Sequence, residues 1–315
     1  MKPTVLLAAG LSLRLLERVA DKFAILPIDH PDRATMSPEA REARALITFG
    51  RFQTDRALIE ALPRLGLICC YGTGFEGVDL RAARERGITV ANGGTANATA
   101  VAEFTMGLII ASARDMLIGD RGLRRGEWRR GIIDRLPITP GLAGRRLGIY
   151  GLGSIGMKIA ERATPFEMEI AYHNRRQRTD VPFAYHATLS SLATWSDILV
   201  VAVRAAESNR HSINAEILKA LGPKGRLVNI SRGLVVDHDA LCDALESHRI
   251  AGAALDVYEH EPEVPARLIG LENVVLTPHM AAISGSAQRA QRDLLIANLE
   301  AFFAGRPVVA PVELA

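Results

Sequence analysis

The stretch Leu147–Gly156 reads Leu-Gly-Ile-Tyr-Gly-Leu-Gly-Ser-Ile-Gly, an apolar run that ends in glycines before a helical pattern begins. The glycines are Gly151, Gly153 and Gly156, with the spacing G-x-G-x-x-G. In such a turn the first permits a tight bend, the second lets the backbone approach a pyrophosphate, and the third lets the helix pack close to the strand. The free N–H groups and the dipole at the helix start favour a phosphate. The stretch therefore predicts a strand–turn–helix unit that binds a dinucleotide.

The residues after the next expected strand, Met168–Tyr172, indicate which dinucleotide. This strand ends about 20 residues beyond the glycines, where an acidic residue usually accepts a hydrogen bond from the ribose 2′-OH. The chain has Asn174, Arg175 and Arg176 there instead. Because a guanidinium offers paired donors to a phosphate, these three residues favour NADP(H) over NAD(H) and are our candidates for the discriminating groups. A solvated basic turn is the alternative interpretation.

The composition is typical of a globular protein. The chain has 315 residues, which is enough for two domains, and 48% of them are hydrophobic. Its 38 basic and 35 acidic residues give a formal net charge of +3, too balanced to indicate nucleic acid or a membrane surface as a partner. The cysteines Cys69, Cys70 and Cys242 show neither disulfide nor metal-ligand spacing. We therefore expect no metal and a cytoplasmic location, and we expect the arginine cluster in residues 121–130 to be solvated.

Apolar strand-like runs alternate with helical patterns along the chain. The expected strands are Val5–Ala8, Phe23–Leu26, Ala45–Phe49, Leu67–Tyr71 and Ile88–Ala91 in the first part, and Ile198–Val203, Arg226–Ile230, Gly252–Val257 and Val274–Thr277 beyond the glycine motif. The expected helices include Leu11–Ala20, Arg56–Leu62, Leu80–Arg86, Ala98–Asp115, Ala215–Leu221 and Asp239–Ser247. Such an order predicts parallel sheets covered by helices on both faces. The second part should form a six-stranded dinucleotide fold from about Gly148 to Thr277.

Three expected strands of the second part are followed by residues that can carry chemistry. Arg232 follows the first, Glu259 and Glu261 follow the second, and His279 follows the third. The carboxyl ends of parallel strands meet at one edge of a sheet, where ligands bind. An arginine can hold a carboxylate, a histidine can donate a proton, and an acid on the far ring nitrogen keeps that imidazole charged. Singly, each would more often be a surface residue, but together they suit reduction of a 2-keto acid by a nicotinamide.

With these motifs, the chain resembles the D-isomer-specific 2-hydroxyacid dehydrogenases nearly from end to end. The resemblance is carried by the glycine turn, Asn229–Gly233, Leu255–Tyr258 with Glu261-Pro262, and Thr277–His279. It implies a Rossmann cofactor domain, residues 98–284, inserted in a flavodoxin-like substrate domain, residues 1–97 and 285–315. Residues 172–176 look like those of the NADPH-using glyoxylate, hydroxypyruvate and hydroxyphenylpyruvate reductases of that family.

The resemblance also implies roles for single residues. Arg232 would bind the substrate, His279 would be the acid/base, and Glu261, rather than Glu259, would orient it. Thr73 and Gly74 would hold the substrate carboxylate through their backbone. The implied cofactor contacts are Gly151, Gly153, Ser154, Ile155, Gly156, Val203, Ile230, Ser231, Asp256, which would reach the nicotinamide carboxamide, and Ala281.

Two departures from the family pattern concern the pocket and the cofactor. Met280–Ala282 replaces a more usual glycine-containing run, and Asn209 stands where a threonine is common. Neither removes a catalytic group. Relatives are usually dimers built on the linking helix, so a homodimer is expected, and Trp128 matches a region that in some relatives reaches a neighbouring active site.

Three functions stay open. The favoured one is NADPH-dependent reduction of a short 2-keto acid such as glyoxylate, hydroxypyruvate or a bulkier arylpyruvate to the D-2-hydroxy acid. The second is an NAD-dependent dehydrogenase of another substrate range. The third is a nucleotide-sensing corepressor or scaffold, which the intact trio of Arg232, Glu261 and His279 disfavours.

Overall fold

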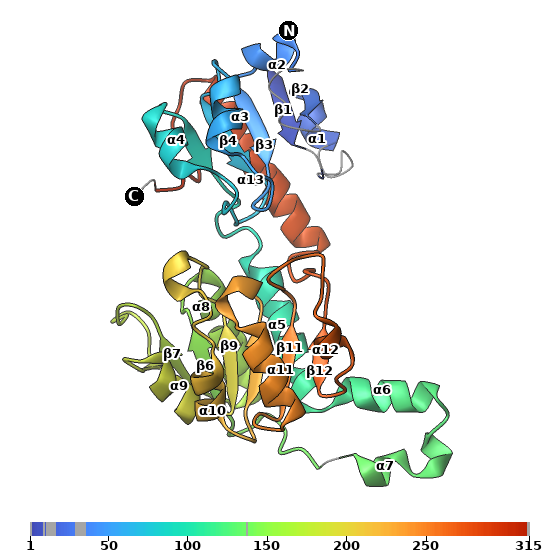
Figure 1. Cartoon of the computed structure of the whole chain (residues 1–315). Helices are drawn as coiled ribbons and strands as arrows, with labels where there is room; N and C mark the ends of the chain where they lie inside the picture. Colours follow the sequence, from blue (N-terminus) through green and yellow to red (C-terminus); the bar gives the residue numbers. More distant parts are fainter. Residues whose placement is uncertain (1, 9, 11–16, 29–35, 137, 314–315) are drawn as a thin grey trace. The chain divides into compact units, whose positions relative to one another are not determined.

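The computed structural model describes residues 2–8, 10, 17–28, 36–136 and 138–313 (Figure 1). The chain forms two compact units, one of Met1–Asn97 with Ile283–Ala315 and one of Ala98–Ala282. Each unit contains its own parallel sheet, so the expectation of two doubly wound parallel-sheet domains is confirmed. Within the described part of the chain, every helix is too short or too polar to cross a membrane.

The first unit has a five-stranded sheet in the order β2-β1-β3-β4-β5, and all neighbouring strands are parallel. This is the flavodoxin-like order. The strands are β1 (Thr4–Ala8), β2 (Ala24–Ile28), β3 (Ala45–Thr48), β4 (Leu67–Cys70) and β5 (Thr89–Ala91). The helices are α1 (Glu17–Ala20), α2 (Pro38–Glu42), α3 (Arg56–Ala61), α4 (Leu80–Glu85) and α13 (Gly285–Phe303). Most of the helix expected over Leu11–Ala20 lies outside the described residues.

Both faces of this sheet are covered, which explains why its strands read as continuous apolar runs. Every residue of β3 and β4 is buried. One face packs on α3 and α4 in a core that includes Leu46 and Ile68, and the other packs on α13 in a core that includes Ile47. The adjacent thiols of Cys69 and Cys70 therefore belong to opposite cores, and both are free.

The second unit has a seven-stranded parallel sheet in the order β12-β11-β10-β9-β6-β7-β8. The strands are β6 (Arg146–Tyr150), β7 (Glu169–His173), β8 (Ala184–Tyr185), β9 (Ile198–Val201), β10 (Arg226–Asn229), β11 (Gly252–Leu255) and β12 (Val274–Leu276). The expected count of six strands is wrong. The additional strand, β8, has two residues, one exposed and one half-buried, so it forms no apolar run that a sequence pattern could reveal. It supplies the third strand of the dinucleotide-binding order.

Helices cover both faces of the second sheet as well. They are α5 (Ala98–Ala113), α8 (Ser154–Ala163), α9 (Leu189–Trp195), α10 (Ala215–Leu221), α11 (His238–Glu246) and α12 (Ala266–Ile269), with 3-10 turns η3 (Thr164–Phe166), η4 (Glu207–Asn209) and η5 (Gly233–Val235). The end of α5 is anchored to β10 by an ion pair between Arg226 Nη2 and Asp115 Oδ1 at 3.0 Å. Because both side chains are about nine-tenths buried, this pair fixes the helix against the sheet.

An arm, residues 116–136, extends from the rest of the second unit (Figure 1). It contains α6 (Met116–Arg124), η2 (Trp128–Arg130) and α7 (Ile132–Arg135). Arg124 pairs with Asp120 and Arg125 with Glu127, and both arginines are exposed. The basic side chains described here are therefore solvated, as the sequence predicts.

Candidate active site

His279 and Glu261 make the central contact of the site. They follow β12 and β11, which are neighbouring parallel strands. The distance between His279 Nδ1 and Glu261 Oε2 is 2.7 Å. The Glu261 side chain is 9% exposed and that of His279 is 38% exposed. The carboxylate is thus shielded, while the imidazole keeps one accessible side. Because Nδ1 faces Glu261, Nε2 is the ring nitrogen free to meet a ligand.

The second oxygen of Glu261 is also held. The backbone N–H of Tyr258 donates to Oε1 at 3.1 Å. The Tyr258 hydroxyl lies against the strand ends and donates to the carbonyls of Leu255 at 3.3 Å and Thr277 at 3.1 Å. Burial raises the pKa of Tyr258 to about 12, so this hydroxyl remains a donor at neutral pH. With one oxygen fixed by a backbone donor, Glu261 presents the other to His279.

Asp256 fixes the segment that carries His279. Its Oδ1 accepts hydrogen bonds from Thr277 Oγ1 at 2.6 Å and from the N–H of Met280 at 2.9 Å, and its Oδ2 accepts from the N–H of Ala281 at 2.9 Å. The side chain of Asp256 is buried. His279 itself has φ +51°, in the left-handed region. The sequence predicted only a cofactor contact for Asp256. Its hydrogen bonds to Thr277 before His279, and to Met280 and Ala281 after it, were not predicted.

Arg232 follows β10, the neighbour of β11 on the side away from β12. Asn229 Nδ2 donates to the carbonyl of Arg232 at 3.0 Å, and Arg232 Nη1 donates to the carbonyl of Ser231 at 2.7 Å. The next residue, Gly233, has no room for a side chain, because a Cβ there would lie 2.0 Å from the carbonyl carbon of Tyr258. The backbone beside Arg232 therefore packs directly on the segment that holds Glu261.

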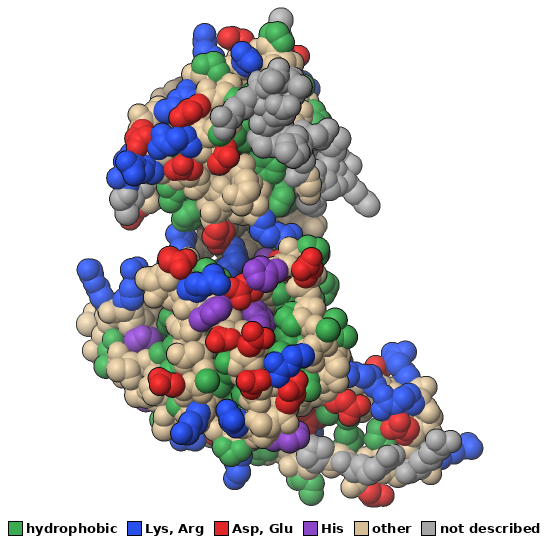
Figure 2. Space-filling view, viewed as in Figure 1, with side chains coloured by type: hydrophobic (Ala, Val, Ile, Leu, Met, Phe, Trp, Pro, Cys, Tyr) green, Lys and Arg blue, Asp and Glu red, His purple; other side chains and the backbone are tan. Residues whose placement is uncertain are grey.

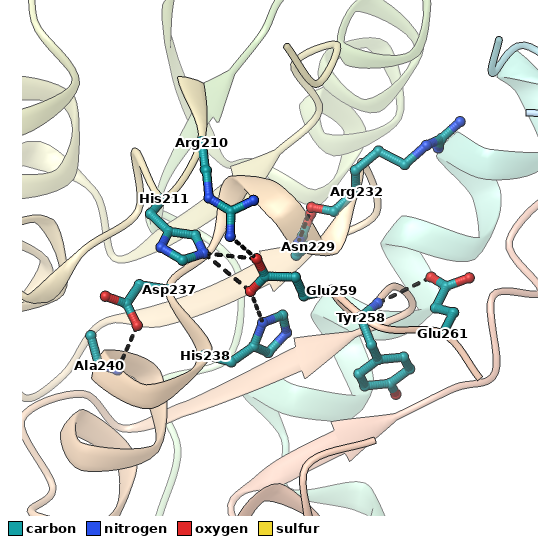
Figure 3. Close-up of polar contacts among 10 residues, drawn as sticks. All are labelled: Arg210, His211, Asn229, Arg232, Asp237, His238, Ala240, Tyr258, Glu259 and Glu261. Atoms are coloured by element: carbon teal, nitrogen blue, oxygen red, sulfur yellow. Dashed lines mark hydrogen bonds and ion pairs between the residues drawn. The ribbon is translucent and has the colours of Figure 1, made fainter. Parts of the chain in front are cut away.

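The two glutamates that the sequence left to choose between face different partners. Glu261 contacts His279, whereas Glu259 contacts Arg210 and His211. Figure 3 shows Arg232 directed away from this second group. Figure 2 shows histidine side chains gathered with acidic and basic side chains on one part of the surface of the second unit.

The glycine turn between β6 and α8 fits a dinucleotide phosphate. Gly151 has φ +102°, and a Cβ there would lie 2.5 Å from the backbone nitrogen of Val203. A Cβ at Gly156 would lie 2.3 Å from the carbonyl oxygen of Gly151, so strand and helix meet without space for a side chain. At Gly153, by contrast, nothing lies within 4 Å of that position, and no side chain caps α8. The N–H groups at Ser154 and Ile155 are therefore open to an anion.

The basic turn is bound to the glycine turn through Leu152. Asn174 Oδ1 accepts from the N–H of Leu152 at 2.7 Å, and Arg178 Nη1 donates to its carbonyl at 3.1 Å. Arg175 and Arg176 are exposed, and neither makes a hydrogen bond or ion pair with a described residue. Their guanidinium groups are thus available, while Asn174 already has a structural bond. Arg178 was not singled out from the sequence, where it was one more arginine in a basic run.

The remaining candidates lie at strand ends of one unit or the other. Ile230 and Ser231 follow β10 and are buried, Val203 follows β9, and Ser231 Oγ donates to Asn229 Oδ1 at 3.0 Å. Asn209, the departure from the family pattern, braces its own loop by donating to the carbonyl of Arg204 at 2.8 Å. Thr73 and Gly74 follow β4 in the first unit.

Comparisons with known proteins show which family this chain is similar to. The family model for the NAD binding domain of D-isomer specific 2-hydroxyacid dehydrogenases matches residues 106–281. The hydroxyphenylpyruvate reductase of Plectranthus scutellarioides is 40% identical over 280 residues, covering 89% of this chain and 88% of that protein. A glyoxylate/hydroxypyruvate reductase of Arabidopsis thaliana is 38% identical over 310 residues, 98% of each protein. The solved structure of the NADPH-dependent glyoxylate/hydroxypyruvate reductase of Sinorhizobium meliloti, in complex with NADP and malonate, has a TM-score of 0.92 and 37% identity, covering 100% of this chain and 98% of that one.

Proposed function

The chain belongs to the D-isomer-specific 2-hydroxyacid dehydrogenase family and is an NAD(P)-dependent oxidoreductase, and on this basis we propose that it reduces a small 2-keto acid to the D-2-hydroxy acid with NADPH. The proposed substrates are of the glyoxylate or hydroxypyruvate type, the substrates named for several relatives. The observation that carries the proposal is the 2.7 Å contact between His279 and Glu261, on neighbouring strand ends next to Arg232.

His279 is the proposed proton donor. Its Nδ1–H is directed to Glu261, so the proton on Nε2 is the one that can pass to the carbonyl oxygen of the substrate. Only an imidazole with a proton on both ring nitrogens can give up the proton on Nε2 and keep its Nδ1–H. After transfer the ring is neutral, and Nδ1 keeps its bond to Glu261. A bound nicotinamide supplies the hydride for the carbonyl carbon.

Arg232 is the proposed substrate-binding residue. Its guanidinium can hold a carboxylate through paired N–H groups and polarise the adjacent carbonyl. Thr73 and Gly74, in the first unit, are the proposed backbone donors to a substrate carboxylate. This division of roles leaves the transferable proton to His279 alone.

The preference for NADPH is proposed from the basic turn. Arg175 and Arg176 are exposed and have no partner among the described residues, so they can meet a 2′-phosphate without breaking an existing bond. The Sinorhizobium meliloti enzyme, which is described as NADPH-dependent, supports this choice. Asn174 would position the turn through its bond to Leu152 and could offer its Nδ2 as a further donor.

The proposal is tested by steady-state kinetics. Purified protein should oxidise NADPH when glyoxylate or hydroxypyruvate is added, and an arylpyruvate tests the bulkier range. His279→Ala and Arg232→Ala should each abolish turnover, whereas His248→Asn, at an exposed histidine with φ +53°, serves as the matched control. Near-normal rates in the first two variants would contradict the assigned roles. A tenfold preference for NADH, equal to about 1.4 kcal/mol, would contradict the cofactor assignment.

We also propose that the chain forms a homodimer. The arm exposes the apolar side chains of Leu123 (52%) and Trp128 (61%). These line a hollow of about 410 Å³ together with Gly126 and Arg129. Large exposed apolar side chains on a projecting segment are typical of an interface. Light scattering should give twice the chain mass, and a monomer at micromolar concentration would refute this part of the proposal.

A further inference from the structure

A polar cluster outside the proposed catalytic trio lies at the same edge of the second sheet. The Glu259 carboxylate pairs with Arg210 Nη2 at 2.5 Å, and His211 Nε2 lies 3.1 Å from each of its oxygens. His238 Nδ1 lies 3.9 Å from Glu259 Oε2. We call these four residues the Glu259 cluster, and Figure 3 shows their side chains converging on the carboxylate.

The members of the Glu259 cluster come from three different loops. Arg210 and His211 follow η4, on the connection from β9 to α10, where the proposed cofactor contact Val203 also lies. His238 begins α11, just after the segment of Arg232. Glu259 follows β11 and lies two residues before Glu261. The cluster therefore ties together the loops that carry the proposed cofactor, substrate and acid-orienting residues.

The cluster is linked to Glu261 through the backbone of one residue, Tyr258. The N–H that holds Glu261 Oε1 belongs to Tyr258, the residue directly before Glu259. The Tyr258 ring stacks on His238 with centroids 6.5 Å apart. A Cβ at Gly233 would lie 2.2 Å from the nitrogen of Glu259, so the next peptide, between Tyr258 and Glu259, has no space in which to shift. Holding the Glu259 side chain thus holds the donor that orients Glu261.

The burial of Glu259 distinguishes it from a solvated surface pair. Its side chain is 15% exposed, whereas Arg267 of α12 and Glu246 of α11, which pair with each other, are 43% and 44% exposed. Burial alone would raise the pKa of Glu259, but the hydrogen bond and charge of His211 and the charge of Arg210 hold it below its ordinary value. The carboxylate is therefore charged at neutral pH and attracts both partners.

A metal site is the other chemistry that two histidines and a glutamate suggest. Among the described residues, however, no group of three or more such side chains is arranged to hold a metal ion. Arg210 also places a positive charge on the carboxylate, where a cation would have to bind. The charged groups facing His238 are Glu259, His211, Asp237 and His260, and none of them completes a ligand set.

We infer that Glu259, held by Arg210 and His211, is a positioning residue that keeps Glu261 directed at His279. This inference rests on the proposed function, because it assumes that Glu261 orients the proton donor. Glu259 touches no reacting atom in this account. Its effect passes through the Tyr258 backbone, so its loss should weaken the proton-transfer step more than substrate or cofactor binding.

The test compares Glu259→Gln with Glu246→Gln, a matched loss of a glutamate charge from an exposed pair in the same unit. Glu259→Gln should lower kcat for NADPH-driven reduction of glyoxylate by about tenfold, with smaller changes in KM for either substrate. Glu259→Asp, which keeps the charge, should recover part of the loss, and Glu246→Gln should match the wild type.

A folded Glu259→Gln variant with a kcat within twofold of the wild type would overturn the inference, as would an equal loss of kcat in Glu246→Gln. If Glu259→Gln does not fold, the double variant Arg210→Gln with His211→Gln replaces the two partners of Glu259, which are more exposed than Glu259 itself. It should show the same loss of kcat. If the wild type reduces no keto acid, the proposed function fails. The crystal structure of Glu259→Gln then decides the inference by whether the bonds of Glu261 to Tyr258 and His279 are lost or kept.

Discussion

Replacing Arg175 and Arg176 together by serine should convert an NADPH-preferring enzyme into one that no longer distinguishes the two cofactors. Neither side chain makes a hydrogen bond or ion pair with a described residue, and both are exposed, so their loss should leave the fold unchanged. Asn174 keeps the turn in place through its 2.7 Å bond from Leu152. The effect should therefore be confined to the 2′-phosphate.

The size of the effect follows from this exposure. A hydrogen bond to a charged group contributes about 1.5–3 kcal/mol, and solvent screening places exposed arginines at the lower end of that range. Loss of one arginine should then raise KM for NADPH about tenfold, and loss of both should raise it about a hundredfold. KM for NADH and kcat with either cofactor should change little, because no 2′-phosphate or reacting atom is involved.

The assay is initial-rate kinetics with glyoxylate and each cofactor, repeated at two salt concentrations. The NADPH preference should weaken at higher salt, because exposed charges are screened. Arg249→Ser, at another exposed arginine of the second unit, is the matched control and should behave as the wild type. An unchanged KM for NADPH in the double variant, or an equal rise for NADH, would refute the assignment of these arginines to the 2′-phosphate.

Three further predictions concern stability. His238 is buried with neither ring nitrogen hydrogen-bonded to a described residue, and burial lowers its pKa from 6.5. As the pH falls below about 6.5, the unfolded chain therefore takes up a proton at this residue before the folded chain does. His238 should then lower the free energy of unfolding by at most about 1.4 kcal/mol per pH unit. Urea unfolding of His238→Phe should show a smaller pH dependence than that of the wild type. Gly233→Ala should lower the thermal midpoint and the rate together, since its Cβ would meet backbone at 2.0 Å; a variant as stable as the wild type would show that this packing is looser than described. Arg226→Met leaves Asp115 as a buried unpaired charge and should cost about 3–5 kcal/mol in urea unfolding, part of which Asp115→Asn should restore; single and double variants of equal stability would exclude a role for the ion pair.

The fold was predictable where local pattern and tertiary environment agree. The central strands of both sheets are buried on both faces, so they appear in the sequence as continuous apolar runs, as in Leu67–Cys70. The two-residue strand β8 was missed because its pairing with β7 depends on neighbours rather than on its own composition. For the arm, the sequence predicted only that its basic residues lie on a solvated loop or helix face, and the structure has Arg121 and Arg124 on the helix α6.

The sequence alone determined the order of every strand except β8, the place of the glycine turn and the three strand ends that bear Arg232, Glu261 and His279, because each depends on residues close together in the chain. Only the tertiary structure decided what those residues touch. It directs Glu261 to His279 and Glu259 to Arg210 and His211, and it commits Asn174 to Leu152. It also gives Asp256 the task of holding the His279 segment. These contacts join residues far apart in the chain, and a one-dimensional pattern contains no information about which side chain turns toward which neighbour once parallel strands have brought their ends together.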